Sequence, residues 1–291
     1  MAGSEPVNVW DVGTELGEGP VWVERDRALW FTDIKRQKIH RFDPESGEKR
    51  SWDAPEQVGF VLPAAGGGFV AGLMSGLHRF NETTGEFELI AQVDAHLPEN
   101  RLNDGTVDPS GRVWFGTMDN SENSKSGSFY RFENGRVLPT GLTGIAITNG
   151  PALSPDGRIL YWIDTLERRM DVCEVADDGS LGPSRPLVRF GPGEGNPDGP
   201  AVDSEGCIWV GMYGGWHALR YSPQGELIER VRLPTANVTK IAFGGPDLRT
   251  AYATTARHLL SRGELERQPQ AGGLFSFRVD VPGIPCPLVA L

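Results

Sequence analysis

Four short side chains with oxygen donors recur in one local setting along this sequence. Glu18 in GEGPVW, Asn103 in LNDGTV, Asn149 in TNGPAL and Asp198 in PDGPAV each precede a glycine by one or two residues, and an apolar run follows. A glycine there allows a sharp turn that brings the backbone close to a central object. Carboxylate and amide oxygens with a low net charge suit a divalent cation such as Ca²⁺, Mg²⁺ or Mn²⁺. These positions therefore predict a cation site, with ordinary Asx turns before strands as the alternative.

A repeated pattern of apolar strands and glycine-containing turns surrounds these residues. Each copy contains an apolar stretch with an aromatic residue, a polar turn and a second apolar strand, and the copies begin at Leu29, Phe69, Val113, Leu160, Ile208 and Ala251. This spacing of 40 to 48 residues, with about four short strands per copy, is typical of a β-propeller blade. We therefore expect an all-β, six-bladed β-propeller that forms one domain over residues 1–291. VNVWD at 7–11 is expected to complete the last blade and close the ring.

The repeat places the four oxygen-bearing residues at one structural position. Each stands ten or eleven residues before the start of its copy, and Lys240 and Val58 occupy the equivalent positions of the two remaining copies. In a propeller, the loops that enter the innermost strands converge on the mouth of the central channel. The predicted cation site therefore lies at the channel mouth.

The overall composition excludes several classes of partner. Lys and Arg number 28 against 39 Asp and Glu, so the net charge of −11 would repel a nucleic acid backbone or an anionic membrane. No apolar run is long enough to span a membrane, and no signal peptide is recognisable. Three scattered cysteines, Cys173, Cys207 and Cys286, indicate neither a disulfide framework nor a thiolate zinc site. We expect a cytoplasmic protein with a small-molecule partner, without nucleic acid or membrane binding, and a monomer or weak oligomer.

Several long motifs occur in the order typical of one known family. They are LGEGPVW at 16–22, RLNDGTVDPSGRVWFGTM at 101–118, ITNGPALSPDG at 147–157, NPDGPAVDSEG at 196–206, FGGPD at 243–247 and QPQAGGLFSF at 268–277. With them the sequence resembles the SMP-30/gluconolactonase family, which includes the regucalcins, over essentially the whole chain. DIKRQKIHRFDP at 33–44 and WDAPEQV at 52–58 look particularly like bacterial sugar lactonases such as xylonolactonase.

The resemblance implies a set of site residues. Members of this family are six-bladed propellers that hold one divalent metal at the channel mouth through a Glu, an Asn and an Asp, which correspond here to Glu18, Asn149 and Asp198. The identity of the metal is open among Ca, Mg, Mn, Zn and Fe(II). An Arg and an Asn that hold sugar hydroxyls correspond to Arg101 and Asn103.

One segment departs from the family pattern. Many members carry a Glu shortly after the GTM motif for substrate contact, whereas the segment here is GTMDNSENSKSG, with Asp119 and Ser121 in that region. We assign Asp119 to substrate binding, and the 119–128 loop leaves the sugar specificity open.

These residues together imply hydrolysis of a cyclic ester. The expected substrate is an aldonolactone such as xylonolactone, arabinonolactone or gluconolactone, and the expected product is the sugar acid. The metal would polarise the lactone carbonyl, and Asp198 is the candidate general base for the attacking water. Two alternatives stay open, namely a lactonase or esterase that acts on non-sugar esters and a calcium-binding, regucalcin-like protein without catalysis.

Overall fold

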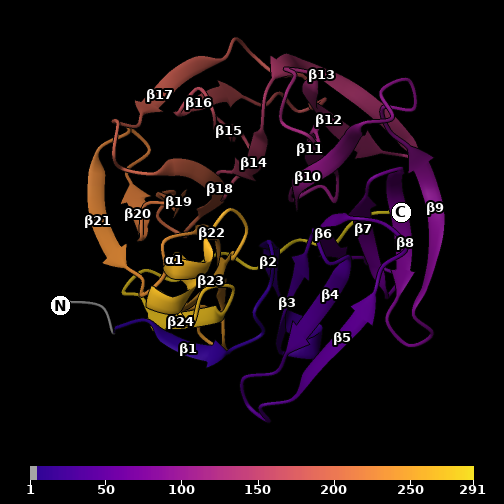
Figure 1. The fold of residues 1–291 in the computed structure, drawn as a ribbon. Helices are drawn as coiled ribbons and strands as arrows, with labels where there is room; N and C mark the ends of the chain where they lie inside the picture. Colours follow the sequence, from indigo (N-terminus) through magenta and orange to yellow (C-terminus); the bar gives the residue numbers. More distant parts are fainter. Residues whose placement is uncertain (1–4) are drawn as a thin grey trace.

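The computed structural model describes residues 5–291, which form six four-stranded antiparallel sheets around a central axis (Figure 1). Blade 1 contains β2 (Gly17–Val23), β3 (Ala28–Asp33), β4 (Lys38–Phe42) and β5 (Lys49–Asp53). Blade 2 contains β6 (Val58–Pro63), β7 (Phe69–Leu73), β8 (Gly76–Asn81) and β9 (Glu86–Gln92). Blade 3 contains β10 (Asn100–Val107), β11 (Val113–Asp119), β12 (Gly127–Glu133) and β13 (Arg136–Ile145).

The remaining blades follow the same order of strands. Blade 4 contains β14 (Thr148–Leu153), β15 (Ile159–Asp164), β16 (Arg169–Glu174) and β17 (Arg185–Arg189). Blade 5 contains β18 (Asn196–Val202), β19 (Ile208–Tyr213), β20 (His217–Tyr221) and β21 (Leu227–Arg232). Blade 6 contains β22 (Val238–Gly244), β23 (Thr250–Thr255), β24 (Leu274–Arg278) and β1 (Val7–Trp10). Within residues 5–291, the all-β fold and the six blades are confirmed.

Two short helices interrupt the strands of the described chain. A 3₁₀ turn, η1 (Glu24–Asp26), connects β2 to β3, and α1 (Arg262–Arg267) lies between β23 and β24. The helix forms inside the SRGELERQ stretch because Ser261 and Glu264 make a capping box. Neither helix of the described residues is long and apolar enough to cross a membrane.

The predicted repeat corresponds to the blades strand by strand. Each copy of the repeat begins in the second strand of a blade, and the polar positions before the copies fall in the first strands. First strands of neighbouring blades contact one another, as β2 does with β6 and β22. They are therefore the innermost strands of the ring.

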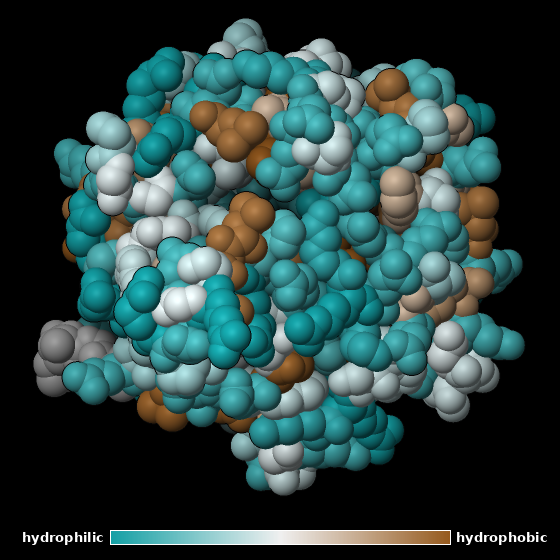
Figure 2. All heavy atoms as spheres, viewed as in Figure 1, coloured by the Kyte–Doolittle hydropathy of each residue, from teal (hydrophilic) through white to brown (hydrophobic). Residues whose placement is uncertain are grey.

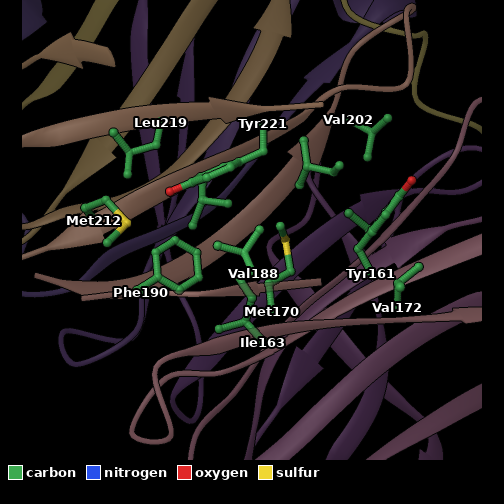
Figure 3. Packing of buried hydrophobic residues seen from close by; sticks show 13 residues of the cluster. Tyr161, Ile163, Met170, Val172, Val188, Phe190, Val202, Met212, Leu219 and Tyr221 are labelled. Carbon is green, nitrogen blue, oxygen red and sulfur yellow. The ribbon is translucent and has the colours of Figure 1, made fainter. Parts of the chain in front are cut away.

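Burial decreases from the axis to the rim of the disc. Every residue of β2, β6, β14 and β22 is buried, whereas the outermost strands β5, β9 and β21 are mostly exposed. The apolar core lies between neighbouring sheets. Between blades 4 and 5, for example, Ile163 and Met170 pack against Met212 and Tyr221 (Figure 3).

Strands from the two ends of the described chain, β1 and β24, pair in blade 6. Strand β1 pairs with β24 in antiparallel register, with Val7 opposite Ser276 and Trp10 opposite Leu274. The prediction that VNVWD completes the last blade is thus confirmed. Both lie at the lower left of Figure 1, in indigo and yellow.

After β24 the chain crosses the end of the channel opposite to α1, and we call residues 279–291 the C-terminal strap. The N–H of Gly283 donates to the carbonyl of Leu248, and the N–H of Ser204 donates to that of Pro282. At the other end of the strap, the N–H of Val289 donates to the carbonyl of Pro63. The strap therefore ties blades 5 and 6 to blade 2.

The closing seam allows a test of the fold. Leu274 is fully buried in the cluster between blades 6 and 1, so Leu274→Ala should lower the free energy of unfolding by about 2–5 kcal/mol. The exposed Leu227 on β21 is the matched control, and Leu227→Ala should change that free energy by less than about 0.5 kcal/mol. Urea unfolding measures both values, and equal losses would contradict this account of the seam.

Candidate functional site

The channel mouth on the α1 side holds a cavity of about 200 Å³, which we call the mouth cavity. Five of the residues predicted from the sequence line it, namely Glu18, Arg101, Asn103, Asn149 and Asp198. Each lies near the start of an innermost strand, on β2, β10, β14 or β18. The structure therefore brings together residues that are up to 180 positions apart in the sequence.

Every innermost strand of the described residues carries a register shift at the repeat position where five of the six strands have a polar residue and β6 has Val58. In blade 1 the shift lies between Glu18 and Val21, and in blade 4 between Asn149 and Ala152. The other four described blades have shifts at the equivalent place. A bulge bends the strand and redirects a side chain. The bulges explain why these short polar side chains point along the channel and into the mouth cavity.

Hydrogen bonds fix the orientation of the Asn149 amide. Its Nδ2 donates to Oγ1 of Thr165 at 2.8 Å, and that hydroxyl donates to the carbonyl of Pro197 at 2.9 Å. Since the nitrogen is used in this way, Oδ1 is the atom left to face the cavity, and it lies 3.3 Å from Nδ2 of Asn103. A partner behind the ligand is the usual means of orienting a metal-binding side chain.

The two carboxylates of the site are buried close to one another. Burial, followed by the negative charge of Asp104, raises the pKa of Glu18 to about 7. Burial and the charges of Glu18 and Asp104 raise the pKa of Asp198 well above its ordinary value. A divalent cation between Glu18 and Asp198 would offset this repulsion, so the donor set of two carboxylates and the Asn149 amide fits such an ion. Among residues 5–291, no three His, Cys, Asp or Glu side chains form a cluster that could hold a metal ion.

Arg101 and Asn103 form a rigid unit beside the carboxylates. Nη1 of Arg101 donates to Oδ1 of Asn103 at 2.6 Å, and Nδ2 of Asn103 donates to the carbonyl of Thr148 at 2.6 Å. Nε of Arg101 also donates to Oδ1 of Asn120. Burial lowers the pKa of Arg101 to about 10, so the guanidinium still carries its charge at neutral pH. The site thus contains one fixed cation beside two acidic groups.

Asp119, assigned to substrate binding from the sequence, is the last residue of β11. Its carboxylate accepts hydrogen bonds from the backbone N–H groups of Ser121, Asn123 and Ser124, so it holds the loop that follows β11. It does not line the mouth cavity, whereas Glu122 does. Glu122 has a φ of 60°, a left-handed conformation that turns the chain at this point. Sequence reasoning missed Glu122, although it is a glutamate shortly after GTM, as the family pattern expects.

A buried ion pair crosses the channel beneath the mouth cavity. Nζ of Lys240, on β22 of blade 6, lies 2.6 and 2.7 Å from the two carboxylate oxygens of Asp104, on β10 of blade 3. The N–H groups of Gly105 and Gly150 donate to the same carboxylate. A side chain on Gly199 would place its Cβ 2.7 Å from Cδ of Lys240, so glycine is needed where the lysine stem passes.

A second cavity of about 450 Å³ lies at the other end of the channel. Lys240 lines it, and so do Ile284 to Pro287 of the C-terminal strap. The ion pair therefore stands between two cavities, and the candidate ligands belong to the smaller one.

The ion pair allows a test of its structural role. Lys240→Met leaves the buried Asp104 carboxylate without its cation and should lower the free energy of unfolding by about 3–5 kcal/mol. The double variant Lys240→Met/Asp104→Asn removes both charges and should recover at least half of that loss. The exposed pair Lys125–Glu167 is the control, and Lys125→Met should cost less than about 1 kcal/mol. A double variant as unstable as the single one would contradict the role of charge.

Comparisons with known proteins agree with this geometry. Residues 16–257 match a family model described as "SMP-30/Gluconolactonase/LRE-like region". The chain is 36% identical to a 6-deoxy-6-sulfogluconolactonase of Pseudomonas putida, over 94% of this chain and 95% of that protein. It is 35% identical to an L-arabinolactonase of Azospirillum brasilense, over 91% and 89% of the two chains.

A solved structure of a similar protein has the same fold. It is a calcium-binding protein, regucalcin, of Agrobacterium tumefaciens, with a TM-score of 0.95, 29% identity, and 99% and 98% of the two chains covered. Regucalcin of Xenopus laevis is 33% identical over 90% of each chain. On the strength of the matched family region and these relatives, the chain belongs to the SMP-30/gluconolactonase family.

Proposed function

We propose that this protein is a metal-dependent hydrolase that opens an aldonolactone to the sugar acid. One observation carries the proposal, which is that the mouth cavity joins a cation-binding donor set to the Arg101–Asn103 unit. A protein that only binds a cation needs the donor set alone. A hydroxyl-binding unit beside it is what a sugar-derived substrate needs. The names of two relatives, a sulfogluconolactonase and an arabinolactonase, support the same substrate class.

Glu18, Asn149 and Asp198 would hold the metal. When bound, a divalent cation there supplies Lewis-acid stabilisation for the oxyanion that forms as water adds to the lactone carbonyl. Its identity stays open among Ca, Mg, Mn, Zn and Fe(II), although regucalcin relatives favour calcium.

The protein's own residues would bind, orient and transfer protons. Arg101 donates hydrogen bonds to the hydroxyls next to the carbonyl, and Oδ1 of Asn103 can accept one from them, because both N–H groups of Asn103 already donate to Thr148 and Asn149. Asp198 accepts the proton of the attacking water as the new C–O bond forms. The ester C–O bond of the ring then breaks, and the proton passes to the ring oxygen, which leaves as a hydroxyl group. Burial of Asp198, at 7% exposure, keeps bulk water away from this transfer.

The size of the mouth cavity favours a small substrate. Its volume of about 200 Å³ is below the roughly 300–1,000 Å³ that is usual for drug-sized ligands. One sugar ring suits that space, whereas a long acyl chain or a large aryl ester does not.

The first prediction from this proposal concerns metal and catalysis together. Protein stripped with EDTA should lose lactone hydrolysis and regain it with one or more divalent cations. Asp198→Asn should lower kcat by about 100-fold or more, because the variant lacks a basic carboxylate. Proton release from a panel of aldonolactones, corrected for spontaneous hydrolysis, measures both effects.

The exposed Asp177 provides the matched control for that prediction. Asp177 is exposed in the turn after β16 and does not line the mouth cavity, so Asp177→Asn should keep full activity. Calorimetric metal titration distinguishes a lost base from a lost ligand. An Asp198→Asn protein that binds metal and keeps full turnover would refute the role of Asp198 as base, and metal binding without any lactone turnover would favour a calcium-binding role.

A second prediction concerns the residue that the sequence did not identify. Glu122 lines the mouth cavity and can accept hydrogen bonds from sugar hydroxyls, so Glu122→Gln should raise KM by about tenfold. Glu99→Gln, at an exposed position before β10, should leave KM unchanged. Initial-rate kinetics measure KM for both variants. An unchanged KM in Glu122→Gln would show that another residue of the loop makes the substrate contact.

A further inference from the structure

The walls of the mouth cavity differ between floor and entrance. The floor consists of the buried polar residues described above. The more exposed part of the lining contains Leu16, Ile147, Leu166, Tyr213 and Leu259, which we call the apolar rim, together with Glu122, Asn196 and His258. Leu166 is 50% exposed and Leu259 is 75% exposed, so the protein itself leaves much of their apolar surface in water. Figure 2 shows hydrophobic patches among hydrophilic residues near the centre of this face. An exposed apolar surface around a binding cavity indicates a partner that covers it.

Leu259 occupies a backbone conformation that leucine rarely adopts. Its φ is 64°, in a turn closed by the hydrogen bond from the N–H of Leu260 to the carbonyl of Arg257 at 3.0 Å. Glycine or asparagine is the usual residue at such a position, because a branched side chain is strained there. Strain of this kind is often found at ligand-binding positions. Leu259 is 75% exposed and gains little burial within the chain, so a ligand in the cavity would supply apolar contact that the chain itself does not.

The turn that carries Leu259 is firmly held. The carbonyl of His258 accepts hydrogen bonds from the hydroxyl of Tyr213 at 2.5 Å and from Nδ2 of Asn237 at 3.0 Å. The N–H of His258 donates to the carbonyl of Glu15 at 2.8 Å. The apolar side chain is thus presented at a fixed place over the mouth cavity.

Leu166 is fixed relative to the candidate metal ligands. It follows Thr165, whose hydroxyl accepts from Asn149 and donates to Pro197. The N–H of Arg168 donates to the carbonyl of Thr165 and closes the turn that contains Leu166. Leu166 is therefore held in place at the wall of the mouth cavity.

Charge at the mouth disfavours an anionic group beside these leucines. Burial raises the pKa of Tyr213, and the negative charges of Asp198, Glu122, Glu15 and Glu18 raise it further. Of these charges, those of Glu122 and Glu15 lie outside the candidate cation site, and they repel an anion at the entrance. A hydroxyl group against Leu166 or Leu259 would exchange water for a surface that cannot form hydrogen bonds.

We propose that Leu166 and Leu259 make this protein selective for deoxy-sugar lactones whose exocyclic end is a methyl group. The inference rests on the proposed lactonase function. With the carbonyl on the cavity floor and its neighbouring hydroxyls against Arg101 and Asn103, the substituent beside the ring oxygen is left to point to the entrance. A methyl group at the far end of that substituent is covered by the apolar rim, whereas a terminal hydroxyl or sulfonate group is not matched by it.

The test compares lactones that differ only at that end. L-Rhamnono-1,4-lactone is paired with L-mannono-1,4-lactone, L-fucono- with L-galactono-1,4-lactone, and 6-deoxy-D-glucono- with D-gluconolactone. The metal-loaded protein should show a kcat/KM at least about fourfold higher for the methyl member of its preferred pair, since one buried methyl group is worth about that factor. 6-Deoxy-6-sulfogluconolactone should be the slowest of the gluconolactone series.

Variants assign that preference to the rim. Asparagine tolerates the left-handed backbone, so Leu259→Asn should be at least as stable as the parent protein. In this variant the ratio of kcat/KM for the two members of a pair should fall to about 1. Leu166→Asn should lower the preference as well. Leu227→Asn on the outer strand β21 is the control and should leave the preference unchanged.

The outcomes separate this inference from the function on which it rests. Turnover of both members of every pair at equal rates, or a preference unchanged in Leu259→Asn, would overturn the inference and leave the lactonase function standing. Equal losses for both members in Leu259→Asn would show that the leucine packs against the sugar ring, which also overturns it. Faster turnover of the sulfonate would do the same. No turnover of any lactone would overturn both.

Discussion

The ammonium group of Lys240 reaches across the channel from blade 6 to the carboxylate of Asp104 in blade 3, on the opposite side of the ring. The ion pair lies against the backbone next to two candidate metal ligands. The N–H of Gly150, which follows Asn149, donates to Asp104, and the stem of Lys240 passes Gly199, which follows Asp198. The lysine of the pair lowers the pKa of Glu18 and Asp198, whereas its aspartate raises both, so the pair as a whole does not remove the repulsion between these acidic side chains. A buried ion pair is tolerated when its remaining hydrogen-bonding groups are satisfied, as those of Asp104 are here. The floor of the mouth cavity is built around this contact.

The β-bulges direct the polar side chains of the innermost strands toward one site at the channel mouth. An innermost strand of regular geometry would send alternate side chains into the sheets on either side. The bulge inserts an extra residue, and in β10 it lets the adjacent Asn103 and Asp104 serve different parts of the channel. Asn103 reaches the mouth cavity, whereas Asp104 meets Lys240 below it. The same deviation in each described blade thus supplies both the polar ring and its support.

The sequence predicts those parts of the protein that follow the repeat. Strand periodicity, which can be read from one sequence, predicts the six blades. It also predicts the common position of Glu18, Asn103, Asn149 and Asp198. The repeat does not predict contacts across the ring, so the pairing of Lys240 with Asp104 could not be inferred from it. Loop residues are equally hidden. Glu122 and Leu259 depend on left-handed backbone conformations in connections that differ in length and sequence from blade to blade.

The sixth blade takes its outermost strand from the start of the chain and its other three strands from the end. During translation, Val7 is made long before its partner Ser276, and at about 5–20 residues per second the interval is roughly 15–50 seconds. Blades 1 to 5 are each continuous in sequence and can form as they leave the ribosome. Strand β1 meanwhile carries an unpaired edge, which other strands could occupy. Closure of the ring must therefore wait until β24 has been made, and until then the edge of β1 is open to mispairing.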